Sequence, residues 1–249
     1  MLFRRDSDVY QPYFTVTQVL SEIKKKFKNH EDYGISETLK KKTKLVSWIT
    51  SNCGYTKGAK ARINLVNKMV ESGIKIDLRG ACFPANPPPP RRGSKEMLEF
   101  LTASKFYLAF ENSYHCKDYI TEKVYRNAFL SGSVPIVWGS KKEDYEAALP
   151  RHSFIFLEDY ASNLTKLNVY LDYLDRNDTA YGEYLNWRLK QYGRNLSTGL
   201  CSLCRRINDV VYVEKNNMKE ARSSDWIYKW YYESEDSECW NKTEHLNDL

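Results

Sequence analysis

The sequence predicts an α/β fold in which a parallel β-sheet is flanked by helices. From Lys44 onward, short apolar segments of strand length alternate with amphipathic segments of helical length, the pattern of repeated βαβ units. The strand segments are almost continuously apolar, as expected of parallel strands buried on both faces. Right-handed crossovers between them then give a Rossmann-like sheet. The composition, with 42% hydrophobic and 28% charged residues among 249, is globular.

Each element has its own signal. The segment KLVSWIT (residues 44–50) is typical of a buried strand, and residues 58–72 form a helix with Ile63, Val66 and Val70 along one face. Ser94 is a possible N-cap for a later helix. The remaining expected elements, in order, are a strand at 74–78, a helix at 94–104, a strand at 105–110, a helix at 121–130, a strand at 134–139, a helix at 142–149, a strand at 153–158 and a helix at 163–175.

The flanks of this pattern differ from it. Residues 1–43 contain one amphipathic segment, VTQVLSEIKKKF, and a charged linker, and are too short for a domain. We assign residues 44–200 to the sheet domain. Residues 201–249 form a charged, aromatic tail with cysteines and without a clear period. The loop NPPPPRRG (residues 86–93) is expected to be stiff and exposed.

The net charge and the motifs limit the kinds of partner that the protein can bind. The net charge of +6 includes the lysine runs Lys24–Lys26 and Lys40–Lys42, which suit a phosphate-bearing partner or form solvated helix faces. No nucleic-acid-binding motif accompanies them. No segment approaches the roughly 18 apolar residues of a membrane span, and the first residues do not form a signal peptide.

Two features favour a secretory compartment. Asn-x-Ser/Thr sequons, candidates for N-glycosylation, occur at Asn163, Asn177, Asn195 and Asn241. Six cysteines accompany them. Because no signal peptide is visible, we expect that the chain as given lacks its own N-terminus.

The segment from Phe110 to Gly139 carries the chemistry. The strand at 105–110 ends in Glu111, Asn112 and Ser113, at the edge where parallel sheets bind ligands. A helix then begins near Thr121, a natural N-cap, and its first turn is a potential anion receptor.

Lys123 in that first turn is unfavourable for the helix by itself, because a cation there opposes the helix dipole. The placement makes sense if a phosphate lies opposite. Glu122 could then accept hydrogen bonds from ribose hydroxyls, and Arg62, on the helix after the first strand, could complete a diphosphate clamp. Alternatively, the helix merely begins Thr-Glu-Lys and Arg62 is a surface residue.

A family resemblance strengthens the nucleotide hypothesis. The segment FYLAFENSYHCKDYITEKVYRNAFLSGSVPIVWG resembles the signature of the α1,3-fucosyltransferases, which use GDP-fucose. FRRDSDV followed by Pro12 and Tyr13 resembles the segment that joins the two domains of these enzymes. SNC with a following arginine, and Cys201-x-x-Cys204, also match. The resemblance extends over nearly the whole chain.

The resemblance implies a GT-B fold of two Rossmann-like domains, of which this chain contains the C-terminal, GDP-fucose-binding one. Residues 1–43 would be a remnant of the acceptor domain and the inter-domain linker. By matching positions, Lys123 and Arg62 would hold the diphosphate and Glu122 the ribose. Tyr119 would contact nucleotide or fucose, and the donor pocket would be lined by Glu111, Asn112 and Ser113.

The implied reaction is inverting transfer of fucose to O3 of N-acetylglucosamine on a glycoprotein or glycolipid, in the Golgi lumen and without a required cofactor. Such a transfer needs a general base, and the family places it in the acceptor domain, so none is nominated here. The membrane anchor would also lie outside this chain. The alternative from another class is a non-catalytic GDP-sugar-binding relic of such an enzyme.

The sequence also contains several weaker signals. Asp6-Ser-Asp8 has the DxD form of manganese-dependent GT-A glycosyltransferases, but no strand precedes it, and no metal site is predicted. Cys201-x-x-Cys204 lacks the second pair of a zinc site, and the family implies that such late cysteines form disulfides. Cys53 and Cys116 both follow strand ends, which makes a disulfide between them a hypothesis. His115 is interpreted as a neutral hydrogen-bonding residue rather than a base.

Overall fold

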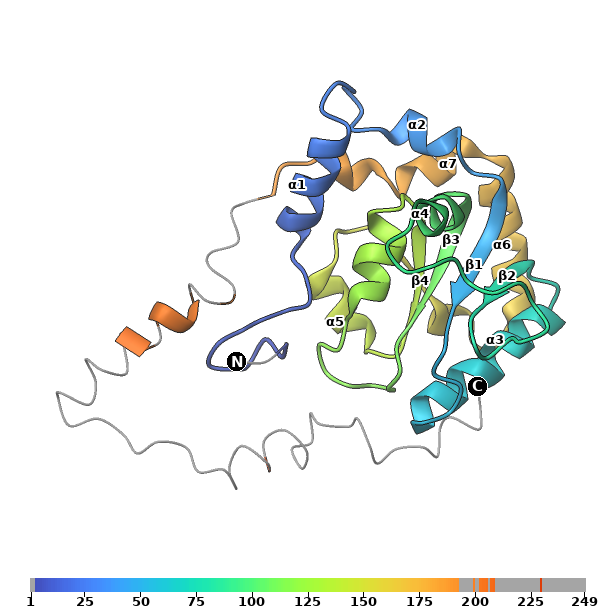
Figure 1. The fold of residues 1–249 in the computed structure, drawn as a ribbon, viewed down its shortest axis with the longest axis horizontal. Coiled ribbons are helices and arrows are strands. Elements are labelled where there is room, and N and C mark those ends of the chain that lie inside the picture. The colour runs from blue at the N-terminus through green and yellow to red at the C-terminus, as the bar shows by residue number, and fades with distance from the viewer. Residues whose placement is uncertain (1–2, 193–198, 200–201, 206, 209–228, 230–249) are drawn as a thin grey trace.

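The core of the protein is a five-stranded, fully parallel sheet (Figure 1). The computed structural model describes residues 3–192, 199, 202–205, 207–208 and 229. The strand order is β2-β1-β3-β4-β5. The strands are β1 (Lys44–Ile49), β2 (Ile76–Arg79), β3 (Ser104–Phe110), β4 (Val134–Trp138) and β5 (Ile155–Phe156).

Every residue of β3 and β4 is buried, as expected of central parallel strands covered on both faces. The covering helices that connect the strands are α3 (Lys57–Glu71), α4 (Lys95–Thr102), the π-helix η1 (Lys123–Phe129) and α5 (Lys142–Ala148). After the last strand follow η2 (Leu157–Tyr160), α6 (Leu164–Arg176), α7 (Asp178–Glu183) and η3 (Asn186–Leu189).

The strand order contains one reversal of direction. The chain passes from β1 outward to β2, and then crosses back to place β3 on the other side of β1. The chain therefore leaves β1 toward one edge of the sheet and leaves β3 toward the other. Such a topological switch point is where open α/β sheets bind their ligands.

The predicted α/β class is confirmed, and the predicted strands and helices occur at or near the expected positions. Two predicted elements differ in detail. The helix expected at 121–130 is a π-helix at Lys123–Phe129, and the last strand spans only Ile155–Phe156. The short helix α2 (Ile35–Leu39) was not predicted, because its five residues are too few to show a hydrophobic period.

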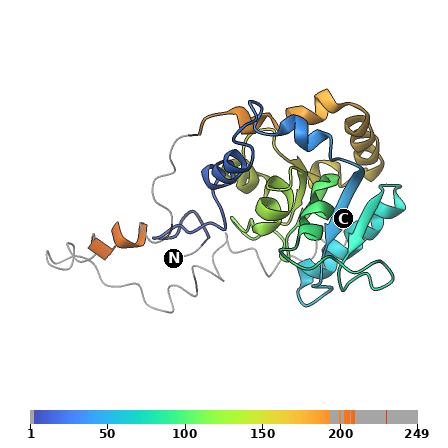
Figure 2. The ribbon, with the colours of Figure 1, turned by 45° about the horizontal axis from the view of Figure 1, so that its top comes forward.

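The amphipathic segment near the N-terminus forms α1 (Val16–Lys26), which begins with a capping box between Thr15 and Gln18. Val19, Leu20 and Ile23 on its inner face are buried in the common core. The described part of residues 3–43 thus packs against the sheet unit. Figures 1 and 2 show α1 and α3 on opposite sides of the molecule.

No helix among the described residues is long and apolar enough to cross a membrane. The domain boundaries at 43/44 and 200/201 remain predictions, and most of the predicted 201–249 tail lies outside the described residues.

Candidate functional site

The loops after β1 and β3 meet at the switch point. Thr56 caps α3 by accepting a hydrogen bond from Ala59 N, and its Oγ1 donates to Asn112 O at 2.6 Å. Gly58, in the first turn of α3, allows this approach: a Cβ there would lie 2.6 Å from Asn112 O and 2.7 Å from Ser113 Cα. Asn112 and Ser113 therefore lie where predicted, at the carboxyl edge of β3, against the start of α3.

Glu111 organises the turn before η1. It is fully buried, and its carboxylate accepts hydrogen bonds from Thr121 N at 2.8 Å and from Thr121 Oγ1 at 2.9 Å. Lys123 Nζ donates to Glu111 Oε2 at 2.7 Å and to Thr121 Oγ1 at 2.8 Å. The expectation that Thr121 caps the helix is wrong: Glu122 occupies the cap position without a side-chain bond, because the Thr121 hydroxyl is used by the buried carboxylate.

Burial raises the pKa of Glu111, while the charge and hydrogen bond of Lys123 and the bonds from Thr121 lower it. The lysine is therefore the main counter-charge of a carboxylate that has no contact with water. Glu111 can affect a ligand only through Lys123 and Thr121, whereas the Lys123 side chain retains 15% of its exposure.

Arg62 is buried rather than exposed, which excludes the surface alternative. Its Nη1 donates to Phe110 O at 2.8 Å, and its Nη2 donates to Thr50 Oγ1 at 2.7 Å and to Asn52 O at 3.2 Å. Arg62 thus joins the carboxyl ends of β1 and β3. Its guanidinium also lies 5.5 Å from the Trp48 ring centroid. The predicted contact with a diphosphate stays a prediction, and in this arrangement Arg62 organises the strand ends.

A cavity of about 720 Å³ lies beside this assembly. Ser51 borders it after β1, and Glu122, Arg126 and Asn127 border it from η1. Asn127 Nδ2 donates to Tyr107 Oη at 2.8 Å, which holds this wall in place. The opposite wall includes Pro89, Pro90, Ser94, Lys95, Met97 and Leu98.

Glu122 therefore faces a cavity, as its predicted role requires. Sequence reasoning missed Arg126, which borders the same cavity. Its position four residues after Glu122 was an available signal, because residues so spaced share a helix face.

The N-terminal segment is fastened to the loop before η1. Arg5 N and Nε donate to the Asp118 carboxylate, at 2.8 and 2.5 Å, and Arg5 Nη2 donates to Asp144 Oδ1 at 2.9 Å. The Tyr119 ring packs against those of Phe3 and Tyr13, with centroid distances of 5.3 and 6.2 Å. Tyr119 thus lies between the two segments, a placement that no local pattern predicted.

Asp6 and His115, which carried two of the weaker signals in the sequence, both contact neighbouring side chains. Asp6 of the DxD-like tripeptide accepts hydrogen bonds from Arg4 at 3.0 and 2.7 Å, and its Oδ2 lies 3.5 Å from Lys117 Nζ. The Arg4 hydrogen bond holds the pKa of Asp6 below its usual value, so this carboxylate is engaged in ion pairs. His115 stacks on Tyr114 and its Nε2 lies 3.5 Å from Glu158 Oε2.

The disulfide hypothesis for Cys53 and Cys116 is wrong. Cys53 is bonded to Cys82, with Cα atoms 5.2 Å apart. Cys82 follows β2, the neighbour of β1, so the disulfide joins the ends of two adjacent strands. Cys82 was therefore a possible partner at the same edge of the sheet. Cys116 is also disulfide-bonded. Cys204 is an exposed free thiol, and Cys201 lies outside the described residues.

Two predicted glycosylation sites lie at helix starts. Asn163 is exposed and caps α6, accepting from Lys166 N at 3.0 Å. Asn177 is half-buried and caps α7, and its Nδ2 donates to Tyr173 Oη at 3.2 Å. Asn195 and Asn241 lie outside the described residues.

The segment that forms this site is similar to segments of known proteins. The model of the family described as "Glycosyltransferase family 10 (fucosyltransferase) C-term" matches residues 39–226 of this chain. The chain is 35% identical over 236 residues to 4-galactosyl-N-acetylglucosaminide 3-alpha-L-fucosyltransferase 9 of Bos taurus, covering 93% of this chain and 56% of the relative. It is 37% identical over 186 residues to alpha-(1,3)-fucosyltransferase 4 of Mus musculus, covering 75% and 39%.

A solved structure described as alpha1,3-fucosyltransferase with GDP-fucose is also similar, with a TM-score of 0.49 and 20% identity over 80% of this chain and 56% of that one. The chain spans about half the length of the curated relatives it matches. The family match covers well over half of this chain and includes every element that surrounds the switch point. The chain therefore belongs to glycosyltransferase family 10, an enzyme family of fucosyltransferases.

Proposed function

We propose that this chain binds GDP-fucose at the switch point and supplies the donor-binding part of an α1,3-fucosyltransferase with the GT-B fold. The observation that carries the proposal is the Glu111–Thr121–Lys123 assembly beside the cavity at Glu122. This places a cation, a carboxylate and a hollow at the edge where α/β sheets bind nucleotides.

Lys123 is the proposed ligand of the diphosphate. An ammonium group has three N–H donors, and in the described structure two of them are directed to Glu111 and Thr121. These bonds hold Nζ in one position, so that the third donor and the charge are preorganised for a phosphate oxygen. Arg62 supports this arrangement by joining the strand ends, and it contributes a second positive charge below the site.

The cavity at η1 suits the nucleoside. Glu122, whose side chain is 42% exposed, can accept hydrogen bonds from ribose hydroxyls. Pro89, Pro90 and Leu98 offer an apolar surface for a base, and Arg126 is available beside them. A volume of about 720 Å³ is within the usual size range of small-molecule sites.

The proposed reaction inverts the anomeric centre. O3 of an N-acetylglucosamine residue attacks C1 of fucose, the bond from C1 to the phosphate oxygen breaks, and GDP leaves. Negative charge grows on the departing phosphate as that bond breaks, and Lys123 stabilises it there. The acceptor hydroxyl gives its proton to a general base, which we assign to the acceptor-binding part of the enzyme. The reaction takes place in the Golgi lumen.

Calorimetric titration of the folded chain with GDP-fucose tests the donor site. We expect binding that persists in EDTA and is lost in Lys123→Ala, with Lys142→Ala as the matched control because Lys142 pairs with Asp159 at the surface. Absence of binding by the folded wild type, or equal binding by Lys123→Ala, would contradict the proposal. Binding of GDP-fucose without transfer, even when an acceptor-binding half is added back, would instead favour the non-catalytic relic.

A further inference from the structure

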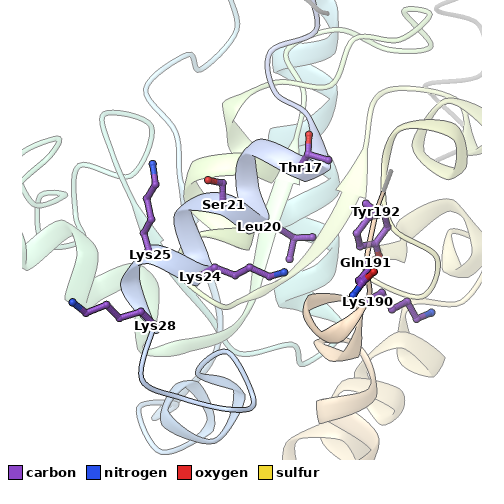
Figure 3. A pocket seen from close by; sticks show the side chains of 9 residues that line it. All are labelled: Thr17, Leu20, Ser21, Lys24, Lys25, Lys28, Lys190, Gln191 and Tyr192. Carbon is purple, nitrogen blue, oxygen red and sulfur yellow. The ribbon is translucent and has the colours of Figure 1, made fainter. Parts of the chain in front are cut away.

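A second cavity, of about 760 Å³, lies between α1 and Lys190–Tyr192, the residues that follow η3 (Figure 3). Figure 3 shows the side chain of Lys24 extending toward Tyr192, whereas those of Lys25, Lys28 and Lys190 point away from the cavity. The lysines at its border therefore do not converge on a common ligand. A more ordered surface lies on α6.

One face of α6 begins and ends at a sequon. The tripeptides Asn163-Leu164-Thr165 and Asn177-Asp178-Thr179 lie before and after this helix, which is at the edge of the molecule in Figure 1. Asn163, Lys166, Tyr170, Tyr173 and Asn177 follow one another at intervals of three and four residues. Side chains with this spacing lie above one another along a helix. Both asparagines therefore share a face with two tyrosines.

A third tyrosine extends this face beyond the start of the helix. Tyr160 lies in the turn before Asn163, where its carbonyl oxygen accepts a hydrogen bond from Asn163 N at 2.8 Å. The rings of Tyr160 and Tyr170 are inclined by 16°, with centroids 6.0 Å apart, and those of Tyr170 and Tyr173 by 22°, with centroids 6.4 Å apart. We call Tyr160, Tyr170 and Tyr173 the tyrosine stripe.

Hydroxyl groups hold two rings of the stripe in place. Tyr170 Oη lies 2.7 Å from Tyr184 Oη, which belongs to a buried side chain. Tyr173 Oη accepts a hydrogen bond from Asn177 Nδ2 at 3.2 Å. Even so, Tyr173 is 52% exposed and its neighbour Val169 is 65% exposed. Tyrosines fixed in this way offer a large amphipathic surface whose ordering costs little conformational entropy.

Asn163 is well placed to carry a glycan over this surface. It is exposed, and its Oδ1 caps α6 by accepting a hydrogen bond from Lys166 N at 3.0 Å. Its Nδ2 makes no hydrogen bond within the part of the chain that the structure describes. N-glycosylation replaces one hydrogen of Nδ2 and leaves Oδ1 unchanged, so the glycan and the helix cap are compatible.

The reach and chemistry of the first sugars match the stripe. Tyr170 is seven residues beyond Asn163, roughly 10 Å along the helix, which is comparable to the length of a disaccharide. Sugar rings have apolar C–H groups on their faces, which can pack on tyrosine rings, and hydroxyl groups at their edges, which can accept from the Lys166 ammonium. Because the glycan is anchored at the end of the same face, its effective concentration there exceeds that of a free partner.

We propose that Asn163 carries an N-linked glycan whose first sugars lie on the tyrosine stripe and cover it. In the transfer, a bond forms from Asn163 Nδ2 to C1 of N-acetylglucosamine, the bond from that C1 to the diphosphate of a lipid-linked oligosaccharide breaks, and Nδ2 loses one proton. The glycan then stabilises the fold, because only the folded chain brings the three rings together. The inference takes from the proposed function only the lumenal location, and it is independent of the donor site.

The test uses the full chain secreted from eukaryotic cells, beside Thr165→Ala, which removes the sequon and keeps the Asn163 cap. Glycopeptide mass spectrometry should find Asn163 occupied in the wild type. Hydroxyl-radical footprinting should then show that Tyr170 and Tyr173 are oxidised severalfold more slowly in the wild type than in Thr165→Ala. Tyr55, which is 92% exposed, is the internal control and should be oxidised at the same rate in both.

Thermal unfolding measures the contact energetically. The glycan should raise the Tm by about 2 to 4 °C, the effect expected of one favourable contact between ring faces in a chain of this size. The gain is the difference in Tm between proteins with and without Thr165→Ala. It should disappear when both proteins also carry Tyr160→Thr and Tyr170→Thr, and their own destabilising effect cancels in the difference. The matched control Tyr55→Thr should leave the gain unchanged.

Three results would overturn the inference: an unoccupied Asn163 in folded secreted protein, tyrosines that are oxidised equally with and without the glycan, or a Tm gain that survives the two tyrosine substitutions. None of the substituted residues lines the cavity at η1, so GDP-fucose titration of the same samples separates the two proposals. Covered tyrosines in a protein that does not bind GDP-fucose would support this inference and contradict the donor site.

Discussion

Replacement of Lys123 by Met removes the cation that faces a fully buried carboxylate. Met has similar length and no charge, so the change isolates the ion pair. Glu111 then keeps only its hydrogen bonds from Thr121. We expect a large, pH-dependent loss of stability, because a buried charge that loses its partner keeps the full cost of its lost hydration.

The size of the loss follows from the geometry. Removing one partner of a buried ion pair costs about 3 to 5 kcal/mol in the free energy of unfolding. Lys123 retains 15% exposure and Glu111 keeps two bonds from Thr121, which places the expected loss near 3 kcal/mol at neutral pH. For a chain of this size, that corresponds to a fall in Tm of roughly 6 to 12 °C.

The pH dependence has a definite sign. In the folded wild type, the pKa of Glu111 lies above its ordinary value of 4.5 because of burial, and Lys123 is the largest opposing influence. Lys123→Met therefore raises this pKa further. Between the ordinary and the folded pKa, the folded protein holds a proton that the unfolded chain releases, so stability falls as the pH rises through that window. The window is wider in the variant, and its loss of stability grows from acidic to neutral pH.

Urea unfolding followed by circular dichroism, at about pH 5 and about pH 8, measures this difference. Lys142→Met is the matched control: it breaks a surface pair with Asp159 and should cost less than about 1 kcal/mol at either pH. A loss for Lys123→Met that is equal at the two pH values, or smaller than about 1 kcal/mol, would refute the reasoning.

Three further predictions concern other parts of the chain. Arg5→Gln should lower the free energy of unfolding by about 2 kcal/mol, because the buried carboxylates of Asp118 and Asp144 lose their hydrogen-bonded cation. Chemical denaturation measures this difference, and a change within experimental error would contradict the stabilising role of the Arg5 ion pairs. Gly58→Ala should destabilise the protein despite the higher helix propensity of Ala, because its Cβ would lie 2.6 Å from a carbonyl oxygen. Gly182→Ala has open space around its Cβ and should stabilise the protein by about 0.5 to 1 kcal/mol. Thermal melting curves of the two variants test both expectations. In protein secreted from eukaryotic cells, Asn163 should carry a glycan at higher occupancy than Asn177, whose amide nitrogen donates a hydrogen bond; glycopeptide mass spectrometry showing the reverse would refute this ranking.

The order and type of the elements follow from the sequence. The strand segments beginning at Lys44, Ser104 and Val134 are recognisable because a strand buried on both faces must be apolar throughout, and the intervening helices show their period of 3.6. The same local information marks the segment from Glu111 to Lys123 as the chemical part of the chain, since polar residues after a buried strand come to the ligand-binding edge.

The partners of those residues were decided by the tertiary structure. Thr121 resembles a helix cap in the sequence, but it bonds the carboxylate of Glu111, ten residues earlier. The spacing of Arg62 puts it on the same face of α3 as Leu65 and Val66. Its hydrogen-bond partners, however, lie at the carboxyl ends of β1 and β3, whose oxygen atoms require donors.

Local patterns determined which segments of the backbone are helical and which are extended, because this depends on neighbours a few positions away. Only the assembled sheet decided that Cys53 pairs with Cys82 and that Arg5 joins Asp118. These contacts join residues 29 and 113 positions apart. The physical reason is that they depend on strand order and crossover direction, which place segments side by side regardless of their distance along the chain.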